Sequence, residues 1–146
     1  MSRTRILVAD TDARIAACYP VLSQLRPQLA ERNFVARIRE LAASTGFRLA
    51  CLEDGGIRAV AGYRIADWLH GGKYLEIEDL VTADGERSRG FGGQLFDWLV
   101  AEARRESCRQ VRLLSGVRRV DAHRFYQRKG MRIEAHYFSL DLGGTG

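Results

Sequence analysis

The stretch VTADGERSRGFGG, residues 81–93, decides the fold that this sequence predicts. A strand-like run, YLEIEDLV at 74–81, leads into it, and an amphipathic run, LFDWLVAEARRES at 95–107, follows it. The stretch is therefore predicted to form a strand-to-helix turn that is rich in glycine and arginine. The first N–H groups of a helix have no partner within the helix and lie at the positive end of its dipole, so this turn favours phosphate binding.

The residues of this turn that would contact phosphates are Arg87, Ser88, Arg89, Gly90, Phe91, Gly92 and Gly93. The glycines carry no Cβ, so a pyrophosphate can approach the backbone N–H groups closely. The arginines add positive charge at the rim. A dinucleotide-binding fold is less well supported, because that fold places its glycine-rich turn in the first strand–helix unit, and here several strands come first.

Two segments of the chain resemble the GNAT superfamily of N-acetyltransferases. The spacing Arg87-x-x-Gly90-x-Gly92 is similar to the family's acyl-CoA pyrophosphate loop, Gln or Arg-x-x-Gly-x-Gly or Ala. The later run AHRFYQRKGM, residues 122–131, is similar to its Ala-x-x-Phe-Tyr-x-x-x-Gly-Phe segment. The resemblance covers residues 46–142. It implies an α/β (α+β) GNAT-like fold in one domain, with a mixed, mostly antiparallel sheet flanked by helices.

The resemblance also implies an activity. As a member of this family, the protein would transfer an acetyl group from acetyl-CoA to a primary amine by direct attack of the amine on the thioester, without a metal ion. The acceptor would be a small cationic molecule or a protein amine, and homodimers are common in the family. The alternative from another class is a catalytically silent module of the same fold that binds acyl-CoA for regulation or interaction.

The candidate proton donor is Tyr126, because the matching tyrosine of the family often protonates the departing thiolate. A carboxylate is wanted to deprotonate the amine, and Glu76 and Glu78 lie on the strand before the loop. Strand alternation predicts that these two glutamates share a face and that Asp79 points to the opposite one. Bound water remains an alternative base, and each acid can also be a solvated or ion-paired strand residue.

Three further positions follow from the resemblance. The family's oxyanion contact is a backbone N–H that corresponds to Leu80 or Val81, where neighbouring parallel strands splay apart. The family often has an asparagine that contacts pantetheine where this chain has Arg119, so that contact is in doubt. Arg119 can instead reach a CoA phosphate or remain a solvated charge.

The length of 146 residues predicts a single domain, 1–146, in which residues 143–146 form a loose tail. There is no apolar run long enough for a membrane span and no secretory signal, so a cytoplasmic protein is expected. The three cysteines, Cys18, Cys51 and Cys108, have no C-x-x-C spacing and are interpreted as reduced thiols. The net charge of +5 comes from dispersed arginines, which argues against a dedicated nucleic-acid partner.

The remaining pattern predicts the other elements. Strands are expected at 3–9, 47–53, 57–68, 74–82, 110–114 and 131–142, with a hairpin turn at 54–56. Helices are expected after Asp10, over a run whose apolar face is Phe34, Ile38, Leu41 and Ala42, after the glycine-rich loop, and over 121–129. Pro20 should kink or interrupt the first helix, Gly46 should end the second, and Asp121 should cap the last.

Overall fold

The structure is a computed structural model that describes residues 3–144. These residues form two compact units, which divide after Leu113. The single-domain organisation therefore stays a prediction. Residues 1–2 and 145–146 lie outside the described residues, and the second pair is half of the predicted loose tail.

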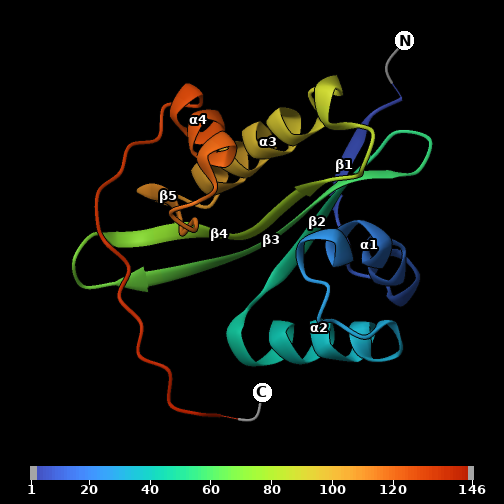
Figure 1. Ribbon diagram of the computed structural model, residues 1–146, viewed down its shortest axis with the longest axis horizontal. Helices are drawn as coiled ribbons and strands as arrows, with labels where there is room; N and C mark the ends of the chain where they lie inside the picture. Colours follow the sequence, from blue (N-terminus) through green and yellow to red (C-terminus); the bar gives the residue numbers. More distant parts are fainter. Residues whose placement is uncertain (1–2, 145–146) are drawn as a thin grey trace. The chain divides into compact units, whose positions relative to one another are not determined.

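The first unit is built on a five-stranded sheet whose strands lie side by side in chain order (Figure 1). The strands are β1 (Arg5–Val8), β2 (Arg48–Glu53), β3 (Ile57–Trp68), β4 (Gly72–Thr82) and β5 (Gln110–Leu113). The first four pair antiparallel, and β5 pairs with β4 in parallel. The prediction of a mixed, mostly antiparallel sheet is confirmed.

Helices cover both faces of this sheet. The helices α1 (Asp12–Leu25) and α2 (Glu31–Thr45) lie on one face, and α3 (Phe91–Arg105) lies on the other (Figure 1). A short 3-10 turn, η1 (Arg87–Arg89), precedes α3. A crossover through α3 connects the parallel strands β4 and β5, and a right-handed connection is the one that such units adopt.

The ends of the first two helices follow from single residues. Thr11 caps α1, because its hydroxyl accepts a hydrogen bond from the backbone N–H of Arg14 at 3.2 Å. Gly46 ends α2 in the left-handed region, at φ 75°, as predicted. Pro20 lies inside α1 without ending it, so an interruption at this residue is wrong.

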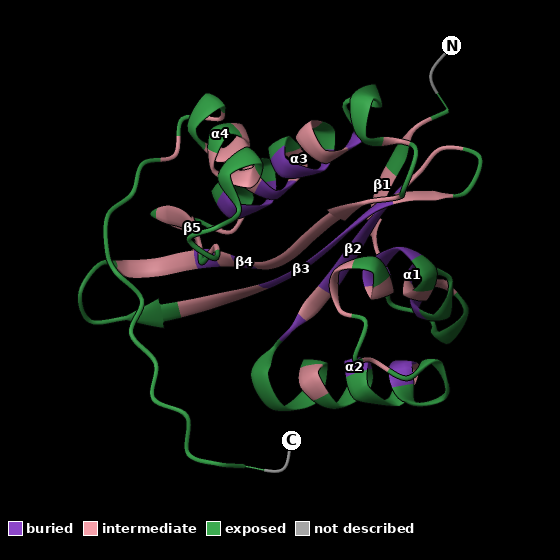
Figure 2. Cartoon of the chain, in the orientation of Figure 1, coloured by how far each residue is buried: buried purple, intermediate pink, exposed green. Residues whose placement is uncertain are grey.

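The core fills both faces of the sheet. Figure 2 shows buried residues concentrated on β2, on β3 and on the sheet-facing side of α3. On the α1 and α2 face, the buried cluster includes Ile15, Cys18, Leu22, Phe34, Ile38, Phe47, Leu49, Cys51 and Val60. On the other face, the rings of Tyr63 and Trp98 meet edge to face at 6.2 Å. All three cysteines are free, and Cys18 and Cys51 are fully buried, which agrees with structural thiols.

An extra residue interrupts the pairing of β3 with β4. Gly62 pairs with Asp79 and the next residue, Tyr63, pairs with Ile77, so Glu78 has no counterpart on β3. This is the arrangement of a β-bulge, which bends a strand and reverses the alternation of side chains beyond it.

The parallel pairing of β4 with β5 ends at the same level. Its last pair is Ile77 with Leu113, whereas β4 continues to Thr82. From Glu78 onward, no strand of the described chain lies along the β5 side of β4. The strand splay that the family resemblance implied stays a prediction, because β5 itself ends at Leu113, where its pairing with β4 stops.

The second unit contains one helix, α4 (Val120–Arg128). Arg119 occupies the N-cap position without a side-chain capping bond, and Asp121 lies in the first turn. The prediction that Asp121 caps the helix is therefore wrong, although its charge still complements the helix dipole. His123 contacts the backbone oxygen of Gly116 through Nε2 at 2.8 Å, a structural contact within this unit.

The strand predicted at 131–142 is wrong for the single chain. No strand is assigned among residues 131–144, and their side chains are mostly exposed. The alternating apolar pattern indicates which side chains would share an apolar face, but a strand also needs a neighbouring backbone with which to form hydrogen bonds. The described chain gives this segment no such neighbour.

Candidate active site

The glycine-rich loop presents the start of α3. Gly90 is the N-cap of α3 and has φ 79°, a left-handed conformation that glycine adopts without strain. The helix begins at Phe91, so its first free N–H groups belong to residues 91–93. Phe91 is buried and anchors this turn to the core. The loop therefore has the backbone geometry of an anion site.

A second glycine leaves little space for a side chain. A Cβ on Gly92 would lie 3.1 Å from Oγ1 of Thr82, at the end of β4. The strand and the first turn of the helix thus approach each other closely at this point, which supports a role for a residue without a large side chain.

The two loop arginines differ in how firmly they are held. Arg89 forms an ion pair with Glu86 at 2.9 Å, and its guanidinium lies 4.9 Å from the centre of the Phe91 ring. Arg87 approaches Asp84 at 3.5 Å, and both of these side chains are about three-quarters exposed, at 74% and 77%. An ion pair with that exposure holds its partners weakly. Arg89 is therefore the better positioned of the two arginines.

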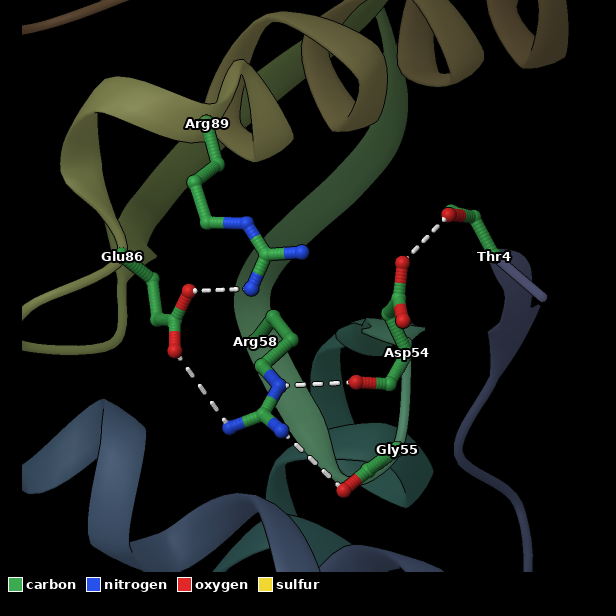
Figure 3. Close-up of polar contacts among 6 residues, drawn as sticks. All are labelled: Thr4, Asp54, Gly55, Arg58, Glu86 and Arg89. Carbon is green, nitrogen blue, oxygen red and sulfur yellow. Dashed lines mark hydrogen bonds and ion pairs between the residues drawn. The ribbon is translucent and has the colours of Figure 1, made fainter. Parts of the chain in front are cut away.

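Glu86 links the loop to the β2–β3 hairpin (Figure 3). Its second oxygen lies 3.7 Å from the guanidinium of Arg58. Arg58 donates hydrogen bonds to the backbone oxygens of Asp54 at 2.8 Å and Gly55 at 3.1 Å. Asp54 in turn accepts a hydrogen bond from the hydroxyl of Thr4 at 2.9 Å. This chain of contacts fixes the Glu86 carboxylate that positions Arg89.

The orientation of the β4 backbone separates the two oxyanion candidates. The N–H of Ala83 donates to the backbone oxygen of Arg58 on β3 at 2.8 Å. Because backbone N–H groups alternate between the two edges of a strand, the N–H of Val81 also faces β3. The N–H of Leu80 then faces the opposite edge, beyond the point where the pairing of β4 with β5 ends.

Three carboxylates of β4 form a cluster with three arginines. The pairs are Glu76 with Arg112 at 2.7 Å, Glu78 with Arg64 at 3.0 Å, and Asp79 with Arg26 at 2.6 Å. Arg26, which caps the end of α1, also donates to the backbone oxygen of Glu78 at 3.1 Å. Sequence reasoning found the three acids and missed their arginine partners, which come from α1, β3 and β5.

The predicted separation of Asp79 from the two glutamates is wrong. A Cβ on Gly62 would lie 2.6 Å from both Asp79 Oδ2 and Phe47, whose ring belongs to the core on the α1 and α2 face. Asp79 therefore lies on that face. The reason is the bulge at Glu78, because one extra residue returns the next side chain to the face of Glu76.

Burial distinguishes Glu78 within this cluster. It raises the pKa of the Glu78 carboxyl, and the positive charges of Arg64 and Arg26 oppose that rise. The negative charges of Asp79 and Glu76 add to it. A carboxyl with a raised pKa holds a proton more readily, which suits a group that must accept one.

Glu76 is held in a different way. Its partner Arg112 stacks on two aromatic rings, with the guanidinium 3.7 Å from the centre of the Tyr74 ring and 4.4 Å from that of Trp68. Stacking and ion pairing together fix the guanidinium, so one Glu76 oxygen is committed to a salt bridge. The parallel register places Arg112 directly opposite Glu76. This ion pair could therefore have been predicted from the sequence if the register of the two strands had been known.

The remaining candidates lie in the second unit. Burial raises the pKa of the Tyr126 phenol, and the positive charge of Arg119 opposes that rise. The Tyr126 ring packs edge to face with Phe125 at 5.5 Å. The structure thus brings Tyr126 together with Arg119, and the β4 carboxylates together with one another. These two groups belong to different units.

Comparison with known proteins identifies the family to which this chain belongs. Residues 11–131 match the family model described as the acetyltransferase (GNAT) family. The chain therefore belongs to the GNAT family, and it is an acyltransferase. The resemblance found in the loop and in the Phe125-Tyr126 segment is confirmed.

Two curated relatives carry related names. The chain is 38% identical over 125 residues to the uncharacterized N-acetyltransferase YhdJ of Bacillus subtilis, across 84% of this chain and 88% of that protein. It is 31% identical over 130 residues to the aminoalkylphosphonate N-acetyltransferase of Salmonella typhimurium, across 88% of this chain and 82% of that protein. Acetyl transfer is therefore the general reaction.

Solved structures show the same fold. The aminoglycoside N-acetyltransferase AAC(6')-Iy, in complex with CoA, superposes with a TM-score of 0.82 at 16% identity, covering 97% of both chains. No helix of the described residues is long and apolar enough to cross a membrane. Within residues 3–144, no group of three or more His, Cys, Asp or Glu side chains is arranged to hold a metal ion, and a metal-free reaction stays a prediction.

Proposed function

We propose that this protein transfers an acetyl group from acetyl-CoA to a primary amine of a small acceptor by direct attack. The observation that carries this proposal is the opening of the β4 edge from Glu78 onward, immediately before the glycine-rich turn. An extended thioester arm can run along an unpaired strand edge, while its pyrophosphate is held at the start of a helix.

The donor is gripped mainly by backbone groups. The N–H groups at the start of α3 bind the pyrophosphate, and Arg89 supplies charge from a fixed position. The N–H of Leu80 donates to the thioester carbonyl oxygen, where negative charge develops as the amine attacks. Arg87 and Arg119 are candidates for outer phosphate contacts.

Two side chains handle the protons. Glu78 accepts a proton from the acceptor's ammonium group, directly or through water, so that the neutral amine can attack and form the new C–N bond. The second proton, which the nitrogen loses after the attack, passes to water. Tyr126 donates its phenolic proton to the sulfur as the C–S bond breaks. Burial supports this role, because a raised pKa keeps the phenol protonated. Glu76 orients the cluster through Arg112 and is the second candidate base.

The carboxylates and arginines clustered along β4 favour an acceptor that carries both a positive and a negative charge. Carboxylates attract a cationic amine, and Arg26, which is 43% exposed while paired with Asp79, can also meet an anionic group. The relative from Salmonella typhimurium is named for an aminoalkylphosphonate, which combines an amine with a phosphonate. We therefore propose a small zwitterionic amine as the acceptor class. A phosphonate-bearing amine should show a lower KM than the same alkylamine without the phosphonate.

Calorimetric titration with acetyl-CoA, CoA and NAD tests the donor. Binding of both CoA species at micromolar concentrations, without NAD binding, is the expected result. Binding should be followed by release of free CoA thiol when amines are screened, with aminoalkylphosphonates, aminoglycosides, polyamines and a lysine peptide as the first set. A protein that binds no CoA would remove the donor from this proposal.

Arg89→Gln should weaken CoA binding by about 10- to 100-fold, because a positioned guanidinium that meets a phosphate contributes about 1.5–3 kcal/mol. Arg87→Gln should have a smaller effect, since Arg87 is exposed and loosely paired. Titration of each variant with CoA measures the difference. Arg104→Gln, at the far end of α3, is the control for the loss of one positive charge. Equal effects for residues 87 and 89 would contradict the assignment.

Glu78→Gln should lower kcat/KM most strongly near neutral pH and less at high pH, where the amine loses its proton without help. The raised pKa of Glu78 also predicts that the acidic limb of the wild-type profile lies above the range of an ordinary glutamate. Rate profiles from pH 5 to pH 10 test both points. Glu40→Gln, on the exposed face of α2, is the control. A uniform loss across the profile would transfer the role to Glu76 or to bound water.

A further inference from the structure

The β-bulge of β4 lies where the candidate base and the candidate oxyanion donor come together. Glu78 has no counterpart on β3, whereas its neighbours Ile77 and Asp79 are both paired. Leu80, whose N–H faces the unpaired edge of the strand, follows two residues later. The extra residue of a bulge is left out of the regular ladder of hydrogen bonds, so other contacts have to fix the groups around it.

One side chain from outside the sheet makes such contacts. Arg26 follows the end of α1, and its Nη2 donates a hydrogen bond to the backbone oxygen of Glu78 at 3.1 Å. Its Nε donates a second hydrogen bond to Oδ1 of Asp79 at 2.6 Å. One guanidinium therefore binds two consecutive residues of β4. A rigid, planar fork of donors suits this double contact, which a lysine ammonium on its flexible stem does not reproduce.

The space for the Asp79 carboxylate is provided by Gly62, its partner on β3. A Cβ on Gly62 would lie 2.6 Å from both Oδ2 of Asp79 and the ring of Phe47. Any larger residue at position 62 would therefore displace the carboxylate or the core ring. The Asp79 side chain is only 12% exposed, so its carboxylate is committed to Arg26 more than to solvent.

The segment that carries Arg26 is itself fixed. The backbone N–H of Leu29 donates to the backbone oxygen of Arg26 at 3.1 Å, and the hydroxyl of Tyr19 donates to the backbone oxygen of Leu29 at 2.7 Å. The Tyr19 ring packs edge to face on the buried ring of Phe34 in α2, with the ring centres 5.2 Å apart. Arg26 therefore reaches the bulge from a firm support.

We propose that Arg26 and Asp79 form a clamp that fixes the bulge of β4, so that Arg26 is a positioning residue for the Glu78 carboxylate and the Leu80 N–H. The inference rests on the proposed function, because these two groups are the base and the oxyanion donor of that reaction. It also gives Asp79 a role other than that of a base.

The first test is acetyl transfer to a plain alkylamine, which has no anionic group for Arg26 to bind. Arg26→Gln and Asp79→Asn should each lower kcat by about 10- to 100-fold and change the dissociation constant of acetyl-CoA by less than about twofold. The double variant should lose little more than either single variant, because both changes break the same contact. Arg14→Gln is the matched control, since Arg14 joins α1 to Glu53 at 3.2 Å, outside the clamp.

The pH–rate profile separates positioning from a charge effect. Burial raises the pKa of the Glu78 carboxyl, the charge of Arg26 lowers it, and the charge of Asp79 adds to the rise. Arg64 and Glu76, the other charges beside Glu78, are unchanged in both variants. A purely electrostatic role would therefore shift the acidic limb upward in Arg26→Gln and downward in Asp79→Asn, with the same maximal kcat. That result, or additive losses in the double variant, would overturn the proposal.

The second test needs no reaction. Backbone amide relaxation should show residues 78–80 to be rigid in the wild-type protein, and their order parameters should fall in Arg26→Gln and Asp79→Asn but not in Arg14→Gln. Circular dichroism shows which variants are folded, and Arg26→Lys, which keeps the charge but not the double contact, replaces Arg26→Gln if that variant does not fold.

The two tests together distinguish failure of the clamp from failure of the proposed function. Unchanged order parameters at residues 78–80 in a folded Arg26 variant would refute the clamp, whatever the activity. A wild-type protein that transfers no acetyl group, but whose variants lose order at these residues, would retain the clamp and remove the proposed function.

Discussion

Tyr126→Phe is expected to lower kcat by about 100- to 1,000-fold and to leave acetyl-CoA binding nearly unchanged. The substitution removes only the phenolic oxygen, so the ring still packs against Phe125. Without a proton donor, the thiolate must depart as an anion or draw a proton from water. Burial raises the pKa of this phenol, so the wild-type rate should hold to a higher pH than an ordinary tyrosine would allow.

The measurement is a pair of pH–rate profiles, together with calorimetric titration of both proteins with acetyl-CoA. The variant should lose the alkaline limb that reports ionisation of the phenol. Tyr137→Phe removes a hydroxyl from an exposed tyrosine and is the matched control. An unchanged kcat in Tyr126→Phe would exclude the proton-donor role and leave Tyr126 as a packing residue of α4.

Gly92→Asp should weaken CoA binding by roughly 10- to 1,000-fold, because a carboxylate within a few ångströms of a pyrophosphate costs roughly 1–4 kcal/mol. The fold should survive this change. The helix dipole stabilises an acidic residue in the first turn of a helix, so the substitution should lower the affinity for CoA more than the stability of the fold. Measuring both CoA affinity and thermal stability therefore distinguishes a binding defect from a folding defect.

Gly92→Ala is the companion variant. It adds a Cβ that lies 3.1 Å from the Thr82 hydroxyl, without a charge. The family pattern allows alanine at this position, so a small loss of affinity is expected. Titration with CoA and thermal unfolding of both variants give the comparison. If Gly92→Asp binds CoA as tightly as Gly92→Ala does, the loop is only a turn.

Much of the fold was predictable because local signals agreed with tertiary structure. The hairpin at 54–56, the cap at Gly46 and the glycine-rich start of α3 each follow from the conformations that glycine permits. The strand prediction at 131–142 was wrong because an alternating apolar pattern describes one strand and not the neighbour with which it must pair. Strand formation there also needs a backbone to pair with, and residues 3–144 show no backbone pairing for this segment.

The site could be predicted where its residues are contiguous in the sequence, but not where it is built from contacts between distant residues. The loop from Arg87 to Gly93 is contiguous, so a motif could identify it. The pairs of Glu78 with Arg64 and Asp79 with Arg26 join residues that are far apart in the sequence. Side-chain alternation then misplaced Asp79, because a bulge depends on the register between two strands, and the sequence of one strand does not show it.

The bulge at Glu78 has a consequence for how this protein tolerates mutation. Its effect comes from the number of residues between Ile77 and Asp79, and many side chains at position 78 would preserve that number. Deletion of residue 78 would restore regular pairing with β3 and leave Asp79 opposite Gly62, because those two residues are already paired across the bulge. Deletion of residue 78 should therefore preserve the sheet while removing the candidate base, whereas deletion of a paired residue such as Leu75 would shift the register of β4. A library of single-residue deletions along β4, assayed for folded protein, would show position 78 as the tolerant one.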